Sequence, residues 1–219
     1  MRFHIITIFP DIFDSYLNES IIGRAVKNKL ISVKFYNPRD FIKGNKSNYK
    51  PVDDKPYGGG PGMVMRAEPV VHAVAKVLNA VKDKKNKKIL VINFIPDAEK
   101  FTTSFAKTIS KKYTDVILIC GRYEGIDARV DKILKTKKLS IGDYVLTGGE
   151  IPAMILVDCV SRQIPGVLGK YESLEEERIS SSEVYTRPEV LKYKNKNYKV
   201  PKVLLSGNHK LIENWKQKK

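Results

Sequence analysis

The sequence has 219 residues, with 40 Lys and Arg against 24 Asp and Glu, so the formal net charge at pH 7 is +16. This length accommodates one large domain or two small ones, and 42% hydrophobic residues suffice for a buried core, which excludes a disordered tail. The positive charge indicates an anionic partner, either a nucleic acid or a lipid surface.

Apolar segments and cysteines indicate the compartment in which the protein is expected. No stretch approaches the 18 consecutive apolar residues that a membrane-spanning helix needs, and residues 1–10 lack the features of a signal peptide. The cysteines, Cys120 and Cys159, lie in no CxxC or Cys/His cluster, so we predict neither a zinc site nor a disulfide framework. A reducing cytoplasm is the expected location.

The elements of the N-terminal half are predicted from apolar spacing. Residues 3–8 form a short apolar run typical of a strand, helical spacing extends from 11 to 26, and the alternating run 30–36 indicates a second strand. Residues 37–62 show little periodicity and end in a glycine cluster, so we predict a long loop. Residues 67–81 have the spacing of an amphipathic helix.

In the C-terminal half, strands and helices continue to alternate. We predict strands at 89–95, 116–120 and 138–141, and helices at 100–110, 126–134, 148–160 and 207–218. Residues 163–182 form an acidic segment that we expect to be mobile. The alternation predicts an α/β fold with a largely parallel sheet flanked by helices.

Common nucleotide-binding motifs are absent. The chain contains no GxxxxGK[ST] sequence, which argues against a Walker-type NTPase. The glycine cluster at 58–62 does not follow a predicted strand, and Pro61 removes a backbone N–H that a phosphate cradle would use.

Two glycine-containing strand ends are more informative. "CGRYEGID" at 120–127 and "SIGDYVLTGGE" at 140–150 both follow predicted strands. Ligands of open α/β sheets bind at the carboxyl ends of strands, where glycine permits close backbone approach. The pair predicts either a small planar cofactor held by backbone groups or simply tight turns between packed elements.

Nine motifs in order give a more specific identification. Between residues 7 and 209 the sequence contains, in this order, the runs "TIFPDIF", "GRAVKN", "PRDF", "VDDKPYGGGPGM", "CGRYEGID", "SIGDYVLTGGE", "SRQIPGVLG", "YTRPEV" and "VLLSGNH". Together they closely resemble the bacterial tRNA (guanine-N1)-methyltransferase family, TrmD.

The resemblance implies a fold and an activity. Members of this family have the SPOUT fold, in which the C-terminal part of the sheet threads into a deep trefoil knot that binds S-adenosylmethionine. They form obligate homodimers whose active sites are shared between subunits. The family methylates N1 of the guanosine immediately 3′ of the anticodon of tRNA, which maintains the reading frame.

Family residues transfer one at a time onto matching positions. For the cofactor pocket, the matches are Pro96, Gly121, Tyr123, Glu124, Ser140, Ile141, Gly142, Asp143, Tyr144, Val145, Leu146, Gly148, Gly149 and Pro152. Backbone groups around 141–146 would hold the adenine and ribose. Mg²⁺ is a possible further requirement by resemblance, with Glu124 as a carboxylate for it; the sequence shows no dedicated metal-ligand cluster.

The reaction needs a base and a stabilising cation. Guanine N1 carries a proton at neutral pH, so a base must remove it, and a cation near O6 would stabilise the developing charge. By resemblance Arg162 is that cation. The position of the family's Asp falls on Glu177, which we predict to be the base, with Glu175 and Glu176 as alternatives and a solvated acidic linker as the other interpretation.

Two departures from the family pattern stand out. The usual "SPxG" loop reads Ile95-Pro96-Asp97-Ala98 here, and the chain stops at Lys219, soon after Trp215, which predicts a shortened C-terminal tRNA-binding segment. We therefore expect a methyltransferase domain at 1–162, a flexible segment at 163–183 and the shortened segment at 184–219. Another SPOUT RNA methyltransferase and a catalytically degenerate RNA-binding homologue are the alternatives.

The charge partition fits this division. Residues 121–185 carry 9 basic and 11 acidic side chains, net −2, whereas residues 186–219 carry 10 and 2, net +8. The C-terminal lysines alternate with Tyr193 and Tyr198, as in many nucleic-acid surfaces. We expect tRNA to bind there with a steep salt dependence.

Overall fold

The computed structural model of the chain describes residues 1–42, 50–82, 88–169 and 183–217. It divides into two units, Met1–Leu168 and Gly169–Lys219. In its described parts, none of the helices combines the length and the apolar character needed to cross a membrane.

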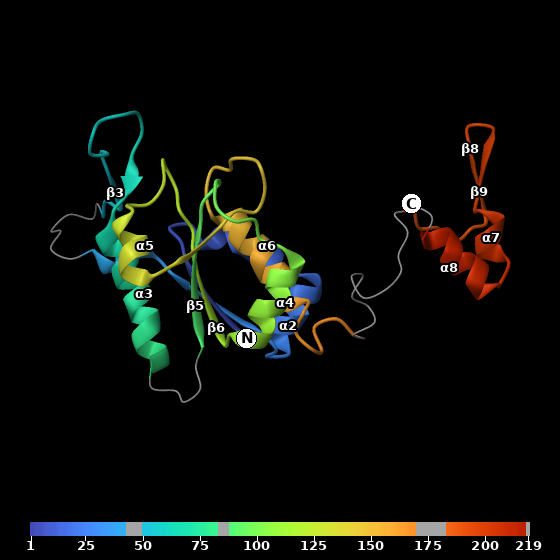
Figure 1. The fold of residues 1–219 in the computed structure, drawn as a ribbon, viewed down its shortest axis with the longest axis horizontal. Coiled ribbons are helices and arrows are strands. Elements are labelled where there is room, and N and C mark those ends of the chain that lie inside the picture. Colours follow the sequence, from blue (N-terminus) through green and yellow to red (C-terminus); the bar gives the residue numbers. More distant parts are fainter. Residues whose placement is uncertain (43–49, 83–87, 170–182, 218–219) are drawn as a thin grey trace. The chain divides into compact units, whose positions relative to one another are not determined.

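A five-stranded parallel sheet is the centre of the first unit (Figure 1). Its strands are β1 (Arg2–Ile6), β2 (Ser32–Tyr36), β5 (Ile89–Phe94), β6 (Asp115–Ile119) and β7 (Lys137–Leu139), in the spatial order β2-β1-β6-β5-β7. The strand β6 is buried along its whole length, because it lies between β1 and β5 with helices on both faces. The predicted α/β fold with a parallel sheet is confirmed.

Helices cover both faces of this sheet (Figure 1). On one face lie α3 (Ala67–Lys82) and α5 (Arg129–Leu134), and on the other lie α2 (Ser20–Lys27), α4 (Thr103–Lys112) and α6 (Glu150–Ser161). Alternate side chains of one strand enter opposite cores, as successive strand residues point to opposite faces. In β6, Leu118 belongs to the core under α4 and α6, and Ile117 to the core under α3.

The predicted helix over 11–26 is divided in the structure. It consists of a 3₁₀ turn, η1 (Pro10–Phe13), a single turn α1 (Asp14–Leu17) and then α2. The break occurs at Glu19, which is extended, and Ser20, whose φ is +50°. The chain bends tightly there, and a Cβ on Gly23 would lie 2.4 Å from the carbonyl oxygen of Asn18.

The predicted loop over 37–62 contains short elements. These are the 3₁₀ turn η2 (Pro38–Phe41) and β3 (Asp53–Asp54), which pairs with β4 (Val64–Met65). The strand β4 in turn hydrogen bonds to the segment after β6, since Met65 N donates to the Gly125 oxygen and Asp127 N donates to that of Met65, both at 2.9 Å. The loop is thus attached to the carboxyl end of the sheet.

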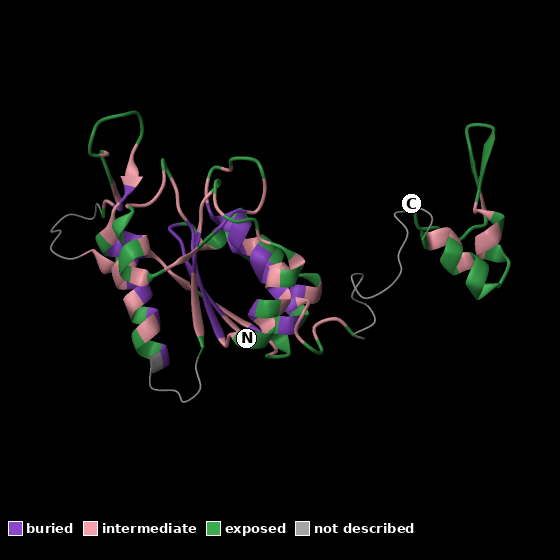
Figure 2. Cartoon of the chain, in the orientation of Figure 1, coloured by how far each residue is buried: buried purple, intermediate pink, exposed green. Residues whose placement is uncertain are grey.

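The second unit contains the hairpin β8 (Val190–Tyr193) and β9 (Lys196–Lys199), then α7 (Lys202–Leu205) and α8 (His209–Gln217). None of the residues 183–217 is buried, and Figure 2 shows the hairpin as exposed. The sequence predicted α8 but not the hairpin, which turns through Lys194 and Asn195, both with positive φ. Tyr185 and Trp215 contact each other, with ring centroids 6.2 Å apart.

Candidate functional site

A cavity of about 440 Å³ lies at the carboxyl ends of β5, β6 and β7 and at the start of α6. This is where parallel α/β sheets bind their ligands. All but two of the predicted cofactor residues line it: Pro96, Gly121, Tyr123, Glu124, Ser140, Ile141, Tyr144, Val145, Leu146, Gly148, Gly149 and Pro152.

The two predicted residues outside the lining are Gly142 and Asp143. Gly142 leaves room for the ring of Tyr144, because a Cβ there would lie 2.3 Å from that ring. The Ser140 hydroxyl donates to the Gly142 carbonyl at 3.0 Å and fixes the turn. Asp143 points outward, where its carboxylate accepts from Lys100 Nζ at 2.5 Å. Neither residue is among those that line the cavity, and their contact with the cofactor stays a prediction.

Close packing of two backbone segments forms the floor of the cavity. Gly149 N donates to the Gly121 carbonyl at 2.9 Å. A Cβ on Gly149 would lie 2.6 Å from Cys120 Cα, so only glycine fits. Burial raises the pKa of the Cys120 thiol, which remains neutral and packs in the core.

A buried ion pair joins the two loops. Arg122 Nε lies 2.9 Å from Glu150 Oε2, and the Glu150 side chain is 1% exposed. The Thr7 hydroxyl donates to the other carboxylate oxygen, Oε1, at 2.8 Å. Arg122 also covers the Phe9 ring at 4.9 Å and donates to the Thr147 carbonyl at 3.3 Å. Its guanidinium thus connects the loop after β6 with the loop before α6. We refer to Arg122, Glu150 and Thr7 together as the loop clasp.

A second polar cluster lies at the wall of the cavity, at the end of β5. Asn93 Nδ2 donates to Asp131 Oδ1 at 2.9 Å, and the Thr136 hydroxyl donates to the same oxygen at 2.5 Å. Lys138 Nζ lies 3.2 Å from Asp131 Oδ2. Burial alone would raise the pKa of Asp131, but the hydrogen bonds from Thr136, Asn93 and Lys138 outweigh burial and lower it. The carboxyl group is therefore ionised at neutral pH.

The glycine-rich loop packs against Glu124, which lines the cavity. A Cβ on Gly62, whose φ is +76°, would lie 2.6 Å from the Glu124 carboxylate. Glu124 N donates to the Met63 carbonyl at 2.9 Å. The segment around 62–63 therefore holds the backbone and side chain of Glu124 beside the cavity.

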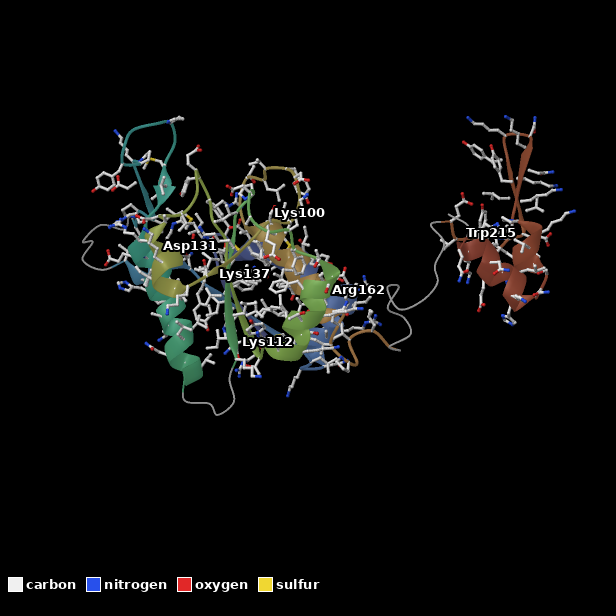
Figure 3. All side chains as sticks on the ribbon, in the orientation of Figure 1. Lys100, Lys112, Asp131, Lys137, Arg162 and Trp215 are labelled. Atoms are coloured by element: carbon white, nitrogen blue, oxygen red, sulfur yellow. The ribbon has the colours of Figure 1, made fainter. Side chains whose placement is uncertain are left out.

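Of the two predicted catalytic residues, the structure describes only Arg162, which is not among the residues that line this cavity. Arg162 caps the carboxyl end of α6, whereas Gly149 and Pro152 line the cavity at the opposite end of that helix (Figure 3). Ten residues of helix rise by about 15 Å, so Arg162 does not reach the cavity of its own chain. Glu177, Glu175 and Glu176 lie outside the described residues.

A second hollow, of about 740 Å³, lies between the β3–β4 hairpin and the helices α3 and α5. Both arginines of its lining pair with carboxylates: Arg129 with Asp127 at 2.5 Å, and Arg66 with Glu68 at 3.8 Å. The charges of these two arginines are therefore balanced by carboxylates within the hollow. The cavity at the strand ends is the better candidate.

Sequence reasoning missed several lining residues, notably Asn93, Asp131 and Lys138. Asn93 carried a usable signal, because a polar residue inside a buried-type strand needs a reason to be there. Asp131 and Lys138 carried none, since each belongs to a different short element and only the fold brings them together.

Comparisons with known proteins bear on the family of the chain. A sequence profile of the family described as tRNA (guanine-1)-methyltransferase TrmD matches residues 1–219. A tRNA (guanine-N(1)-)-methyltransferase of Clostridioides difficile is 46% identical over 221 residues, covering 99% of this chain and 91% of the relative. One from Buchnera aphidicola is 42% identical over 220 residues, covering 99% and 88%.

A solved structure is similar as well. The crystal structure of the tRNA (m1G37) methyltransferase from Aquifex aeolicus matches with a TM-score of 0.77 and 39% sequence identity, covering 99% of this chain and 87% of that one. Profile, relatives and structure agree over nearly the full length, so the chain belongs to the TrmD family of tRNA (guanine-1)-methyltransferases.

Proposed function

We propose that this protein transfers a methyl group from S-adenosylmethionine to N1 of the guanosine immediately 3′ of the anticodon of tRNA. This is position 37, the position named for the Aquifex aeolicus structure. The observation that carries the proposal is the strand-end cavity, whose lining coincides with most of the cofactor residues expected for the family to which the chain belongs.

The cavity fits S-adenosylmethionine in size and chemistry. Its volume of about 440 Å³ lies within the range of roughly 300–1,000 Å³ usual for small-molecule sites. Apolar side chains such as Ile141 and Leu146 suit an adenine ring. Backbone at Gly121 and Gly149 approaches without intervening side chains, and Asn93 adds a buried polar group. When bound, S-adenosylmethionine supplies an electrophilic methyl group on a sulfonium.

We propose that two side chains of the protein remove the N1 proton of guanine and stabilise the charge that develops on its O6 atom. Glu177, the proposed base, would accept the N1 proton, so that the ring nitrogen gains a lone pair able to accept the methyl group. Arg162 would stabilise the negative charge that develops on O6. Mg²⁺ stays a proposed addition: the described residues hold no group of three metal-ligating side chains, so Glu124 would need oxygens from the substrates.

We propose a homodimer that brings Arg162 to the cavity of the other subunit. Its separation from the cavity of its own chain supports this arrangement. An exposed apolar surface supports it further. Ile151 and Ile155 lie one turn apart on α6 and are exposed, and so is Tyr16, whose hydroxyl donates to Asp158 of that helix. An exposed apolar surface of this kind is typical of an interface.

We also propose that the C-terminal part of the sheet carries the deep trefoil knot. The path of the chain supports this: β7 pairs with β5, yet the following segment returns to the end of β6, where Gly149 contacts Cys120 and Gly121. The chain therefore crosses the end of β5 before it enters α6.

For the domains, we propose that 1–162 is the methyltransferase domain and 184–219 a tRNA-binding segment; most of the predicted segment 163–183 lies outside the described residues. The exposed, lysine-rich second unit supports the last assignment, and its net charge suits a nucleic acid. We further propose that the protein works in the cytoplasm, where its tRNA substrate is found.

The test is transfer of labelled methyl groups to tRNA transcripts that carry G or A immediately 3′ of the anticodon. We expect labelling of the G transcript alone. Labelling of both transcripts, or of ribosomal RNA only, would indicate another methyltransferase. Cofactor binding without transfer to any RNA would indicate a degenerate RNA-binding homologue.

Glu177→Gln tests the proposed base. It should lower kcat by about 100-fold or more, since general base catalysis contributes roughly that much, while the Kd for S-adenosylmethionine stays the same. Glu176→Gln is the matched control and should keep normal turnover. Near-normal turnover of Glu177→Gln would remove this residue from the mechanism.

A further inference from the structure

At the wall of the strand-end cavity, a buried carbonyl oxygen has no hydrogen bond within the protein. Asn93 is 4% exposed and lines the cavity. In the described part of the chain, its side-chain oxygen, Oδ1, finds no partner. Buried polar atoms are almost always satisfied in native proteins, so an isolated acceptor at the wall of a ligand cavity calls for an explanation.

The orientation of the Asn93 amide is fixed by its neighbours. An ionised carboxylate only accepts hydrogen bonds, so Asp131 must receive the NH₂ group of Asn93, which lies at 2.9 Å. Thr136 and Lys138 hold the same carboxylate through its two oxygens. Rotating the amide by 180° would place oxygen against oxygen. The carbonyl oxygen is therefore the part of the Asn93 amide that has no hydrogen-bond partner among the described residues.

We propose that Asn93 is a cofactor-recognition residue, whose Oδ1 accepts a hydrogen bond from an N–H group of S-adenosylmethionine. The cofactor has two such groups, the adenine amine and the ammonium of its methionine part. Either would satisfy the carbonyl of Asn93, and the cluster around Asp131 positions that carbonyl before the ligand arrives. This inference rests on the proposed function, because it assumes the cofactor.

The test is a cycle of binding measurements on the full-length protein by titration calorimetry. S-adenosylhomocysteine is the reference ligand. Two analogues each lack one donor: one has hydrogen in place of the adenine amine, and one has hydrogen in place of the α-amine. The variant is Asn93→Leu, which keeps the approximate shape of the side chain and removes the carbonyl.

We expect Asn93→Leu to raise the Kd of S-adenosylhomocysteine by about tenfold, as for a hydrogen bond of ordinary strength. For the wild type, one of the two analogues should have a Kd about tenfold higher than that of S-adenosylhomocysteine. For Asn93→Leu, that analogue and S-adenosylhomocysteine should have the same Kd. The analogue for which discrimination disappears identifies the donor. If the variant distinguishes both analogues as well as the wild type does, the proposal is wrong.

A matched control separates recognition from structural support. Thr136→Val removes a different hydrogen bond to the same Asp131 oxygen, and Thr136 does not line the cavity. It should change the Kd by no more than about twofold. An equal loss of affinity in Thr136→Val and Asn93→Leu would make Asn93 only a support for Asp131, and would overturn the proposal.

The result is independent of the tRNA reaction. Wild-type protein that binds S-adenosylhomocysteine but labels no tRNA would contradict the proposed function and leave the cycle interpretable. The wild type could instead label the G transcript while Asn93→Leu and the wild type distinguish the analogues equally well. That result would contradict only the role of Asn93.

Discussion

At the scale of single residues, the chain contains charged groups in places where burial makes them costly. Glu150 and Asp115 are both nearly or completely buried, and each is compensated by an arginine and by hydroxyl or imidazole donors. Removing one partner of such a pair leaves the other charge in a medium that solvates it poorly. Both groups therefore give predictions that can be measured.

The loop clasp predicts a loss of stability in Glu150→Gln. The variant keeps the shape but leaves the guanidinium of Arg122, which is 20% exposed, without its counter-charge. We expect the free energy of unfolding to fall by about 3 kcal/mol, as for other broken buried pairs. Urea denaturation measures this.

Glu68→Gln is the control for the clasp, because its ion pair with Arg66 spans 3.8 Å between exposed side chains. It should change the free energy of unfolding by less than about 0.5 kcal/mol. Equal effects of the two substitutions would mean that the clasp contributes no more than a surface pair.

Asp115 predicts how stability depends on pH. Burial alone would raise its pKa, but hydrogen bonds from Arg2, His4 and Thr114 outweigh burial and hold the pKa well below its ordinary value of 3.8. A carboxyl group with a lowered folded pKa stabilises the protein above that ordinary value and loses this contribution as the pH falls below it. The pKa of His4 is also lowered, mainly by burial, from 6.5.

Both groups act in the same direction, so the free energy of unfolding should begin to fall below about pH 6.5 and fall more steeply below about pH 4. Urea titrations at a series of pH values test this. Asp115→Asn should be less stable at pH 7 and should flatten the steeper acidic part of the curve. A variant whose curve parallels that of the wild type would contradict the assignment.

At the scale of elements, the sequence was sufficient for the inner strands β5 and β6. The strands β5 and β6 were predicted within one or two residues, because continuous apolar runs mark strands that are covered on both faces. The division of the helix at 11–26 was missed, because apolar spacing continues through the bend at Ser20. The spacing of apolar residues indicates which face of a helix is buried, whereas the bend depends on the backbone at Gly23.

The hairpin β8–β9 was missed for the opposite reason. It has no buried face, so its alternation of Lys and Tyr resembles a solvated loop, and its turn uses Lys194 and Asn195 where Asn-Gly is more usual. Paired residues share a face, which places Tyr193 with Lys196 and Tyr198 with Leu191. More than half of each tyrosine is exposed.

These exposed rings predict a role in tRNA binding. Stacking of a base on an aromatic ring is worth roughly 1–3 kcal/mol, so Tyr193→Ala and Tyr198→Ala should each raise the Kd for tRNA by about fivefold or more. The slope of log Kd against log salt should not change, because neither substitution alters the charge. Filter binding at several salt concentrations measures both quantities.

Two kinds of control apply to the hairpin. Tyr193→Phe keeps the ring and should bind normally. Replacing Lys192 and Lys199 together by Ala should reduce the salt slope by about 1–2, one for each phosphate that a lysine no longer neutralises. Normal tRNA binding by both alanine variants of the tyrosines would exclude base stacking on the hairpin.

At the scale of the whole molecule, the position of Arg162 decides how many chains build one site. The helix α6 separates this residue from the cavity, so a monomer would hold the proposed cofactor site and the proposed stabilising cation apart. The catalytic role of Arg162 stays a prediction from resemblance. Its separation from the cavity could not be predicted from the sequence, because that depends on the length and direction of one helix.

Mixed dimers test the arrangement. Arg162→Ala and a cavity variant such as Leu146→Asp should each be inactive alone. A random equal mixture should recover about a quarter of wild-type activity, because half of the dimers are mixed and each of these has one complete site. Tagged subunits and the labelled methyl assay provide the measurement. A mixture as inactive as its components would place Arg162 in its own chain's site.

The order β2-β1-β6-β5-β7 has a consequence for how the protein is made. The strands β1 and β5 hydrogen bond to β6 from opposite sides and not to each other, so β6 joins the two halves of the sheet. During synthesis, the first 114 residues can form no continuous sheet, and assembly must wait for β6 to emerge. Native-state hydrogen exchange should show the amides of β1 and β5 opening together, with the same free energy. Separate opening would mean that each half holds together without the strand between them.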